Sequence, residues 1–290
     1  MANYAFFTET TADCYPELYE EMGAVALPMT FTIRDRQYKG YADNREMSAH
    51  EFYERMRAGE TCTTSQLTAN EILEALEPAV KEGKEVLYLA FSSGLSGTCQ
   101  SANIAANELR EKYPGCVIEV VDSLLASMGE GLLAYYCGMK LKSGESVRDV
   151  AQWARDNVQN FVAWFTVDDL MFLKRGGRLS GGVAIVGSVL GIKPVLHMDE
   201  VGHLVNMMKV RGRKASLNAL VDRYKKTAVD KENNVVFISH GDSYDDCKYV
   251  ADKIKALGAK EVYIGSIGPV IGSHSGPGTI ALFFLSNNAR

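Results

Sequence analysis

The chain has 290 residues, of which 47% are hydrophobic, and a formal net charge of −5 at pH 7. This length predicts two domains of ordinary size, and the hydrophobic content is that of a globular protein able to bury a proper core. The acidic balance, together with basic segments that are short and interrupted by glycine, disfavours nucleic acid as a partner.

Cysteine usage and the apolar stretches exclude further classes of protein. The six cysteines are scattered without a CxxC pair or a histidine cluster, so we expect free thiols and neither a disulfide framework nor a metal site. The N-terminal residues lack the basic start and long apolar core of a signal peptide. The longest apolar stretch, residues 182–196, is too short to span a bilayer, which requires about 20 residues. We therefore expect a cytoplasmic protein without a membrane span.

The first half of the chain alternates predicted strands and helices, which is typical of a parallel sheet covered by helices on both faces. Residues 34–37 are expected to form a solvated turn, and residues 61–66 a hydroxyl-rich connector. Ligands of such sheets lie beyond the carboxyl ends of the strands, where loops 8–13, 92–98 and 122–127 are expected. The strands are predicted at 4–7, 24–33, 86–91 and 116–121, and the helices at 17–22, 51–57, 69–81, 95–113, 124–142 and 147–158.

After about residue 160 the pattern changes. Residues 175–191 hold six glycines and no acid, and residues 268–278 are expected to form a second glycine-rich loop. Strands are predicted at 161–166, 235–239, 262–266 and 279–285, a hairpin at 193–197 and 204–209, and helices at 168–173, 215–227 and 244–257. The sequence therefore predicts an α/β fold of two domains, a parallel-sheet domain over 1–159 and an α+β domain over 160–290.

The loop Ser92–Thr98 lies where a buried strand is predicted to pass into a helix. Unpaired N–H groups and the helix dipole favour an anion at such a place, and glycines and hydroxyls suit a carboxylate or phosphate. An ordinary capped turn is the alternative interpretation. The chain contains neither a GxxxxGK[ST] phosphate loop nor a GxGxxG dinucleotide motif, and this loop fails the G-x-S-x-G pattern of a nucleophile elbow.

Other candidate residues leave alternatives open. His274 lies in the second glycine-rich loop, where something could approach the backbone, but a lone loop histidine is more often structural. Arg175 and Arg178 could bind an oxyanion or could be solvated surface residues. Ser93 and His274 could belong to a hydrolase, although no orienting acid is indicated by spacing. From the residues alone we infer a two-domain α/β protein with a small-anion site.

Eight segments taken together resemble the DegV family of fatty-acid-binding proteins, which includes the fatty-acid-binding subunits of bacterial fatty acid kinase. Each segment is weak evidence by itself, but the set spans nearly the whole chain in order. Two positions depart from the family pattern: Glu9 stands where Asp is frequent, and Leu67 replaces a proline. The matching segments are residues 64–66, 92–102, 121–123, 126–129, 173–180, 192–194, 210–214 and 267–274.

This resemblance implies a long-chain fatty acid buried between two domains. It places the carboxylate against the hydroxyls of Thr64 and Ser93, with Gly94 and Leu95 as backbone donors and His274 nearby. Burying about 14 methylenes at about 0.8 kcal/mol each would contribute a gross term near 11 kcal/mol, before the ordering costs of binding.

The resemblance also implies a partner protein. In that family the bound acid is presented to a separate ATP-dependent fatty acid kinase and leaves as an acyl phosphate for phospholipid synthesis. Arg175 and Arg178 match the family's basic stretch and are expected to serve kinase docking or phosphoryl transfer. No metal, no cofactor other than the bound fatty acid and no catalytic residue are implied. The alternative hypotheses are a stand-alone serine hydrolase acting on acyl esters and a phosphotransferase that binds ATP itself.

Overall fold

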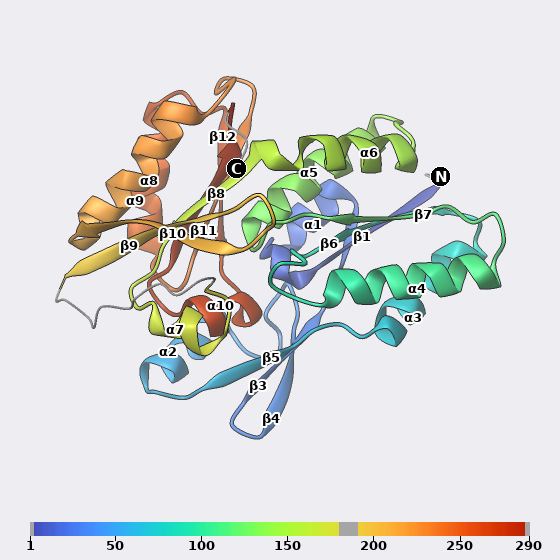
Figure 1. The fold of residues 1–290 in the computed structure, drawn as a ribbon, viewed down its shortest axis with the longest axis horizontal. Helices are drawn as coiled ribbons and strands as arrows, with labels where there is room; N and C mark the ends of the chain where they lie inside the picture. The colour runs from blue at the N-terminus through green and yellow to red at the C-terminus, as the bar shows by residue number, and fades with distance from the viewer. Residues whose placement is uncertain (1–2, 180–190, 288–290) are drawn as a thin grey trace.

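The computed structural model describes residues 3–179 and 191–287, which form three β-sheets with helices packed around them (Figure 1). The apolar stretch 182–196 and the glycine-rich segment 175–191 lie partly outside the described residues. The first sheet is parallel throughout, in the order β2-β1-β6-β7. Its strands are β1 (Tyr4–Glu9), β2 (Ala24–Leu27), β6 (Glu85–Ala90) and β7 (Ile118–Asp122).

Helices cover both faces of this sheet, which is why its central strand β6 is a nearly continuous apolar run. Alternate residues of β6 face opposite sides: Val86 and Tyr88 pack with α4, while Leu87 and Leu89 pack with α5. The helices of this part are α1 (Pro16–Met22), α3 (Ala69–Lys81), α4 (Thr98–Lys112), α5 (Met128–Lys142) and α6 (Val147–Asn157), with short 3-10 turns η1 (Thr10–Ala12) and η2 (Val158–Asn160).

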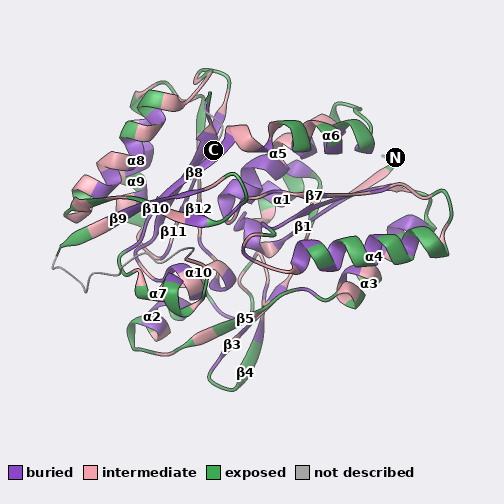
Figure 2. Cartoon of the chain, in the orientation of Figure 1, coloured by how far each residue is buried: buried purple, intermediate pink, exposed green. Residues whose placement is uncertain are grey.

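The second sheet has six strands in the order β10-β9-β8-β13-β11-β12, and only the β11–β12 pair is parallel. Helices α8 (Arg213–Thr227) and α9 (Tyr244–Ala256) cover one face, and α5 lies against the other. Because α5 is packed between the two sheets, most of its residues are buried (Figure 2). The strands are β8 (Phe161–Thr166), β9 (Ile192–Met198), β10 (Leu204–Arg211), β11 (Val235–His240), β12 (Glu261–Ser266) and β13 (Ile280–Leu285).

A third sheet corrects two predictions. It is antiparallel, in the order β4-β3-β5, with strands β3 (Met29–Ile33), β4 (Arg36–Gly40) and β5 (Cys62–Ser65), and α2 (Ala49–Arg57) packs on it. Thus β4 occupies part of the expected turn, and β5 occupies the expected connector. Both are edge strands held by backbone pairing to β3, so neither needs the apolar alternation that marks a buried strand.

The glycine-rich loop predicted at 268–278 is wrong as well, because residues Pro269–Ser275 form helix α10. Pro269 begins this helix with a φ that suits the first turn. Gly272 has no room for a side chain, since Phe52 and Tyr53 of α2 pack directly against it. Close packing against α2 therefore stabilises a helix in a segment whose glycine content disfavours one. A short helix, α7 (Met171–Arg175), packs beside α10.

The predicted division at residues 159/160 coincides with a change of sheet, because the parallel and three-stranded sheets precede it and the six-stranded sheet follows it. Two helices nevertheless cross this division. Helix α5 packs on β8, β11 and β13, and α10 packs on α2, β3 and β5. The division into two domains therefore stays a prediction.

Candidate ligand-binding cavity

A cavity of about 510 Å³ lies among the three sheets. Its volume is within the range of small-molecule sites, about 300–1,000 Å³. The loops at the carboxyl ends of β1, β6 and β7 contribute to its wall, as expected for a parallel sheet. Large apolar side chains from both halves of the chain line most of it, among them Phe91, Leu95, Phe165, Met198, Leu204 and Phe283. The cavity therefore suits a ligand that is mainly apolar.

One polar part of the wall is built around His274. Its Nε2 lies 2.9 Å from Oγ1 of Thr64 on β5. Burial, and secondarily the positive charge of Arg178, lower the pKa of His274 to about 4, so the imidazole is neutral at pH 7. Its Nδ1 is buried and has no hydrogen-bond partner among residues 3–179 and 191–287. The structure thus places a neutral imidazole beside a hydroxyl at the cavity wall.

Gly176 holds the other side of the His274 ring. A Cβ at position 176 would occupy the space of His274 Nδ1, so only glycine lets α7 approach the imidazole this closely. Gly177 differs, because nothing lies near its Cβ direction and its φ of +67° is left-handed. The two adjacent glycines therefore meet different requirements, one of space and one of backbone conformation.

Arg178 brings a positive charge to the same part of the wall. Its Nε donates to the carbonyl of Leu95 at 3.1 Å, and its Nη1 donates to the carbonyl of Gly176 at 2.6 Å. Carbonyl partners orient a guanidinium without neutralising it, and no carboxylate of the described residues forms an ion pair with Arg178 or Arg175. Arg178 is thus a positioned cation with charge to offer an anion.

A second hollow of about 210 Å³ shares Thr64, Arg178 and His274 with the cavity. Arg175 lines this hollow but not the cavity, and its guanidinium lies 4.7 Å from the ring centre of Phe172. The Thr64–His274 pair therefore forms part of the boundary between an apolar cavity and a smaller, basic hollow.

The loop after β6 contributes some of the predicted carboxylate-binding residues to the cavity wall and not others. Ser93 is exposed and does not line the cavity, and its N–H donates to Asp122 at 3.2 Å. The N–H of Gly94 donates to Oγ of Ser92 at 3.2 Å, and that of Leu95 to the carbonyl of Ser92 at 3.0 Å. The predicted backbone donors are therefore engaged within the loop itself. Of the predicted carboxylate-binding residues, Thr64, Leu95 and His274 line the cavity, and the roles of Ser93 and Gly94 stay predictions.

The same loop joins the two larger sheets. Oγ of Ser92 donates to the carbonyl of Gly202 at 2.9 Å, in the turn of the β9–β10 hairpin. Gly94 lies directly against the carbonyls of Val201 and Gly202, leaving no space for a Cβ. This close contact accounts for the glycine without any ligand.

Several hydroxyls of the wall were not singled out from the sequence. Thr11 and Ser127 lie in loops 8–13 and 122–127, whose position at the sheet edge was predicted, and Ser96 lies in the loop after β6. Thr279 had no sequence signal, because it precedes an ordinary apolar strand. Thr11 and Ser127 also contact three buried carboxyls. Thr11 lies beside Glu9 and Glu130, and Ser127 lies beside Asp13.

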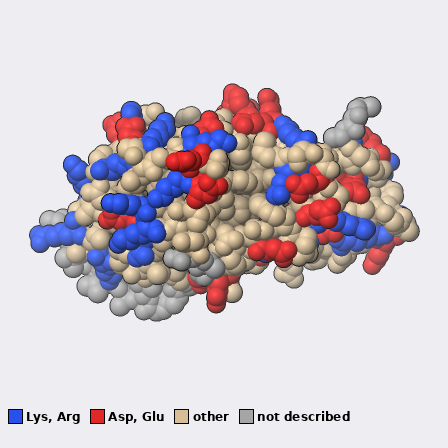
Figure 3. Space-filling model, turned by 90° about the horizontal axis from the view of Figure 1, so that it is seen from above, with Lys and Arg blue, Asp and Glu red and all other residues tan. Residues whose placement is uncertain are grey.

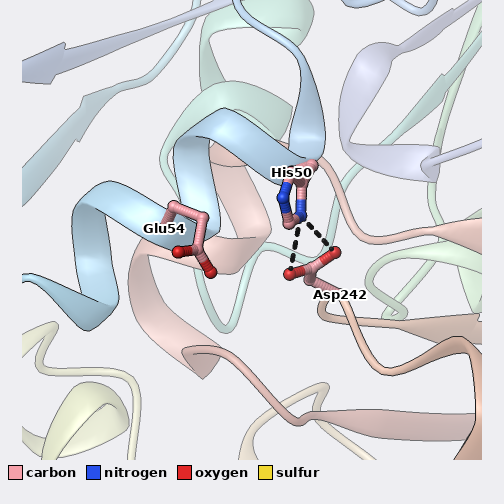
Figure 4. A group of neighbouring side chains, drawn as sticks. All are labelled: His50, Glu54 and Asp242. Carbon is pink, nitrogen blue, oxygen red and sulfur yellow. Dashed lines mark hydrogen bonds and ion pairs between the residues drawn. The ribbon is translucent and has the colours of Figure 1, made fainter.

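His50, Glu54 and Asp242 form the one group of possible metal ligands that the described part of the chain brings together (Figure 4). Nδ1 of His50 lies 3.2 Å from both carboxylate oxygens of Asp242. However, Nη1 of Arg57 donates to Glu54 at 2.8 Å and also to Asp242, so a guanidinium already supplies positive charge there. We assign this group a structural role, linking α2 to the turn after β11.

The charge on the surface is not evenly spread. Figure 3 shows Lys and Arg side chains gathered mainly toward the end of the molecule that α8 and α9 occupy in Figure 1. Ion pairs offset part of this charge, for example Lys193 with Asp168 and Arg213 with Asp246. Among the described residues no helix is long and apolar enough to cross a membrane. The expected cytoplasmic location and the absence of a nucleic-acid partner stay predictions.

Fold and site together define a class of protein: an α/β chain whose parallel and mixed sheets surround a largely apolar cavity with hydroxyl, imidazole and guanidinium groups in its wall. A family model described as "Uncharacterised protein, DegV family" matches residues 3–287. A DegV domain-containing protein of Clostridium perfringens is 39% identical over 288 residues, covering 99% of each chain. The chain therefore belongs to the DegV family, and the family resemblance is confirmed.

Two solved structures are similar over the full chain. A fatty-acid-binding DegV family protein from Thermus thermophilus is 28% identical with a TM-score of 0.88, covering 98% of this chain and 99% of its own. DegV of Bacillus subtilis, a fatty acid binding protein, is 27% identical with a TM-score of 0.85, covering 99% and 100%. These similarities confirm the predicted fold class.

Proposed function

We propose that this protein binds a long-chain fatty acid, with the acyl chain in the cavity and the carboxylate at Thr64, His274 and Arg178. The observation that carries this proposal is the neutral Thr64–His274 pair at the wall of a cavity that is otherwise largely apolar. The relatives from Thermus thermophilus and Bacillus subtilis are described as fatty-acid-binding, which supports the same ligand class.

The hydrogen bonds favour a carboxylate over other head groups. A carboxylate only accepts hydrogen bonds, so the site has to present donors. When His274 carries its proton on Nε2, it donates to Thr64 Oγ1, and the Thr64 hydroxyl proton is then free to point at the ligand. His274 thus acts on the carboxylate by orienting Thr64, and Arg178 adds a positive charge.

We further propose that the carboxylate is presented to a separate ATP-dependent fatty acid kinase through the second hollow. Arg175 and Arg178 line this hollow, so a phosphoryl group could approach the carboxylate there with its charge compensated. The chain itself contains no phosphate-binding loop motif, in keeping with a kinase that supplies the nucleotide. The product would be an acyl phosphate for phospholipid synthesis.

The serine hydrolase hypothesis finds no support in the geometry. Ser93 is exposed outside the cavity wall, and no carboxylate of the described residues accepts a hydrogen bond from His274 Nδ1. A triad requires both a serine beside the imidazole and an acid behind it. We therefore carry forward the lipid-carrier function alone.

Native mass spectrometry of the protein as expressed, followed by organic extraction, tests the binding proposal. We expect an adduct that extracts as a long-chain fatty acid, because so much buried apolar surface should hold the lipid through purification. If delipidated protein fails to take up added octadecanoate, the proposal is overturned.

Hydroxylamine trapping in a lysate of the source organism tests the kinase step separately. We expect octadecanoyl hydroxamate to form only when ATP and the loaded protein are both present, and Arg175→Ala to reduce it without changing octadecanoate affinity. Absence of hydroxamate in every condition would remove the kinase step and leave the binding proposal standing.

A further inference from the structure

Three hydroxyl groups in the cavity wall other than that of Thr64 are almost completely buried. Thr11 is in η1, Ser127 precedes α5, and Thr279 precedes β13; each is at most 4% exposed. A lipid tail needs no hydrogen bonds, so polar groups in this part of the wall call for an explanation. What they can offer a ligand depends on where their protons point.

The Thr279 proton is committed to the protein. Its Oγ1 lies 3.0 Å from the carbonyl oxygen of Ser275 and 2.9 Å from that of Gly276, in the last turn of α10. Carbonyl oxygens only accept, so Thr279 must donate to one of them. Its lone pairs remain available on the face of β13 that also carries Ala281 and Phe283, two further wall residues.

The Thr11 hydroxyl lies between two buried carboxyls. Its Oγ1 is 3.0 Å from Oε2 of Glu130 and 3.5 Å from Oε2 of Glu9. One hydroxyl proton cannot serve both carboxyls, so Thr11 donates to one and can accept from the other only if that one is protonated. Glu130 also accepts a hydrogen bond from the Thr8 hydroxyl, and Glu9 accepts from the Tyr88 hydroxyl and the Phe91 N–H. All of these donors are uncharged.

Ser127 completes the set. Its Oγ lies 2.6 Å from Oδ2 of Asp13 and 2.9 Å from Oγ of Ser239. Asp13 also accepts the Gly268 N–H at 2.9 Å, so this carboxyl is held in place from two sides. The Ser127 proton is thus committed to Asp13 or Ser239, and its oxygen, which lines the cavity, can still accept a hydrogen bond.

We propose that Thr11, Ser127 and Thr279 form an acceptor site for a hydroxyl group on the acyl chain, so that the cavity takes hydroxylated long-chain fatty acids. This inference rests on the proposed function and specifies its ligand class. A chain hydroxyl can donate to these oxygens, whereas a keto or ether oxygen cannot. A carboxylate, which also only accepts, is disfavoured here and directed to Thr64 and Arg178.

Competition in native mass spectrometry tests the inference. Delipidated protein is mixed with equal amounts of octadecanoate and one derivative, either a mid-chain hydroxyoctadecanoate or the matching oxooctadecanoate, with the substituent moved along the chain. We expect at least one hydroxy isomer to be preferred by about 3- to 10-fold, which corresponds to one net hydrogen bond. The matching oxo acid should show no preference over octadecanoate.

Substitutions in the cavity wall test whether the Thr279 hydroxyl causes the preference for a hydroxy acid. Thr279→Val keeps the shape but removes the acceptor, so the ratio of hydroxy acid to octadecanoate should fall toward one, and Thr279→Ser should keep it. Thr227→Val is the matched control and should leave the ratio unchanged, because the Thr227 hydroxyl also donates to a backbone carbonyl, that of Arg223, but does not line the cavity.

Failure of this inference is distinct from failure of the proposed function. If octadecanoate binds but no hydroxy isomer is preferred, or the oxo acid is preferred equally, the acceptor site is wrong and fatty acid binding stands. If neither octadecanoate nor any derivative binds, the proposed function itself is wrong.

Discussion

Thr64 and His274 are separated by 210 positions in the chain, yet Oγ1 of Thr64 lies 2.9 Å from Nε2 of His274. The contact joins β5 of the small antiparallel sheet to α10, and it sits where the apolar cavity meets the basic hollow. Because His274 is neutral and orients a hydroxyl, the pair can hold a carboxylate without a direct ion pair of its own. Under the proposed function, a carboxylate held in this way would stay accessible to a second reactant.

Removing the Thr64 hydroxyl should weaken fatty acid binding. Thr64→Val keeps the β-branched shape but loses the donor, and hydrogen bonds to charged groups contribute about 1.5–3 kcal/mol, so affinity for octadecanoate should fall about 10- to 100-fold. Isothermal titration of delipidated protein measures this. Thr64→Ser should retain affinity within a few-fold, and equal affinity of the Val variant and the native protein would contradict the carboxylate position.

The two adjacent glycines before Arg178 provide a paired test of His274 placement. Gly176→Ala puts a methyl group into the space of His274 Nδ1, so the imidazole must move and octadecanoate affinity should fall. Gly177→Ala meets no neighbour and costs only left-handed backbone strain, about 1 kcal/mol of stability, so affinity should be unchanged.

Histidine NMR signals distinguish displacement from general destabilisation in this pair. The His274 imidazole resonances should shift in Gly176→Ala and stay in place in Gly177→Ala. If both variants bind octadecanoate like the native protein and show unshifted His274 signals, Gly176 does not position the ring.

Stability should decrease with rising pH because of the buried carboxyls. Burial raises the pKa of Asp13 to about 8 and that of Glu9 to about 7, and it raises the pKa of Glu130 as well. The folded state therefore binds more protons than the unfolded state. Each carboxyl therefore adds to the free energy of unfolding. This contribution is fully present below the ordinary carboxyl pKa near 4 and is lost as pH rises through the pKa that the group has in the folded state.

Asp13→Asn isolates one of these contributions. An amide imitates the protonated acid, because its oxygen can accept from Gly268 and its nitrogen can donate to Ser127. Between about pH 5 and 8 the native free energy of unfolding should fall relative to the variant by about 1.4 kcal/mol per pH unit at most. Urea denaturation across this range measures the difference, and parallel curves would show that Asp13 is ionised at neutral pH.

The ion pair that links α2 to the turn after β11 should contribute only modestly to the free energy of unfolding. Arg57 and Asp242 are partly exposed, so solvent screens their interaction, and a double-mutant cycle with Arg57→Ala and Asp242→Ala should give a coupling of about 0.5–1 kcal/mol. Raising the salt concentration should reduce the coupling. Zinc added to the native protein should not raise its melting temperature, and a clear rise would instead support a metal site with His50 and Glu54.

Local sequence pattern determined much of the fold. The apolar run of β6 predicts a strand buried on both faces, and the β9–β10 hairpin is indicated by two runs about a turn. The strand Phe161–Thr166 was predicted with the bounds that the structure has. Such features are decided by residues close in the chain, so periodicity and turn chemistry suffice to predict them. The family motifs likewise pointed to Thr64, Leu95, Arg178 and His274, all of which line the cavity.

Tertiary structure decided what local pattern leaves open. Strand β5 exists because β3 pairs with it, and α10 is a helix although its glycines favour a loop, because Gly272 packs against α2. The same holds for the site: no local signal places Thr279 in the cavity, puts Ser93 outside it or sets Gly176 against His274. These relationships join residues far apart in the chain, and packing between distant elements has no counterpart in local periodicity.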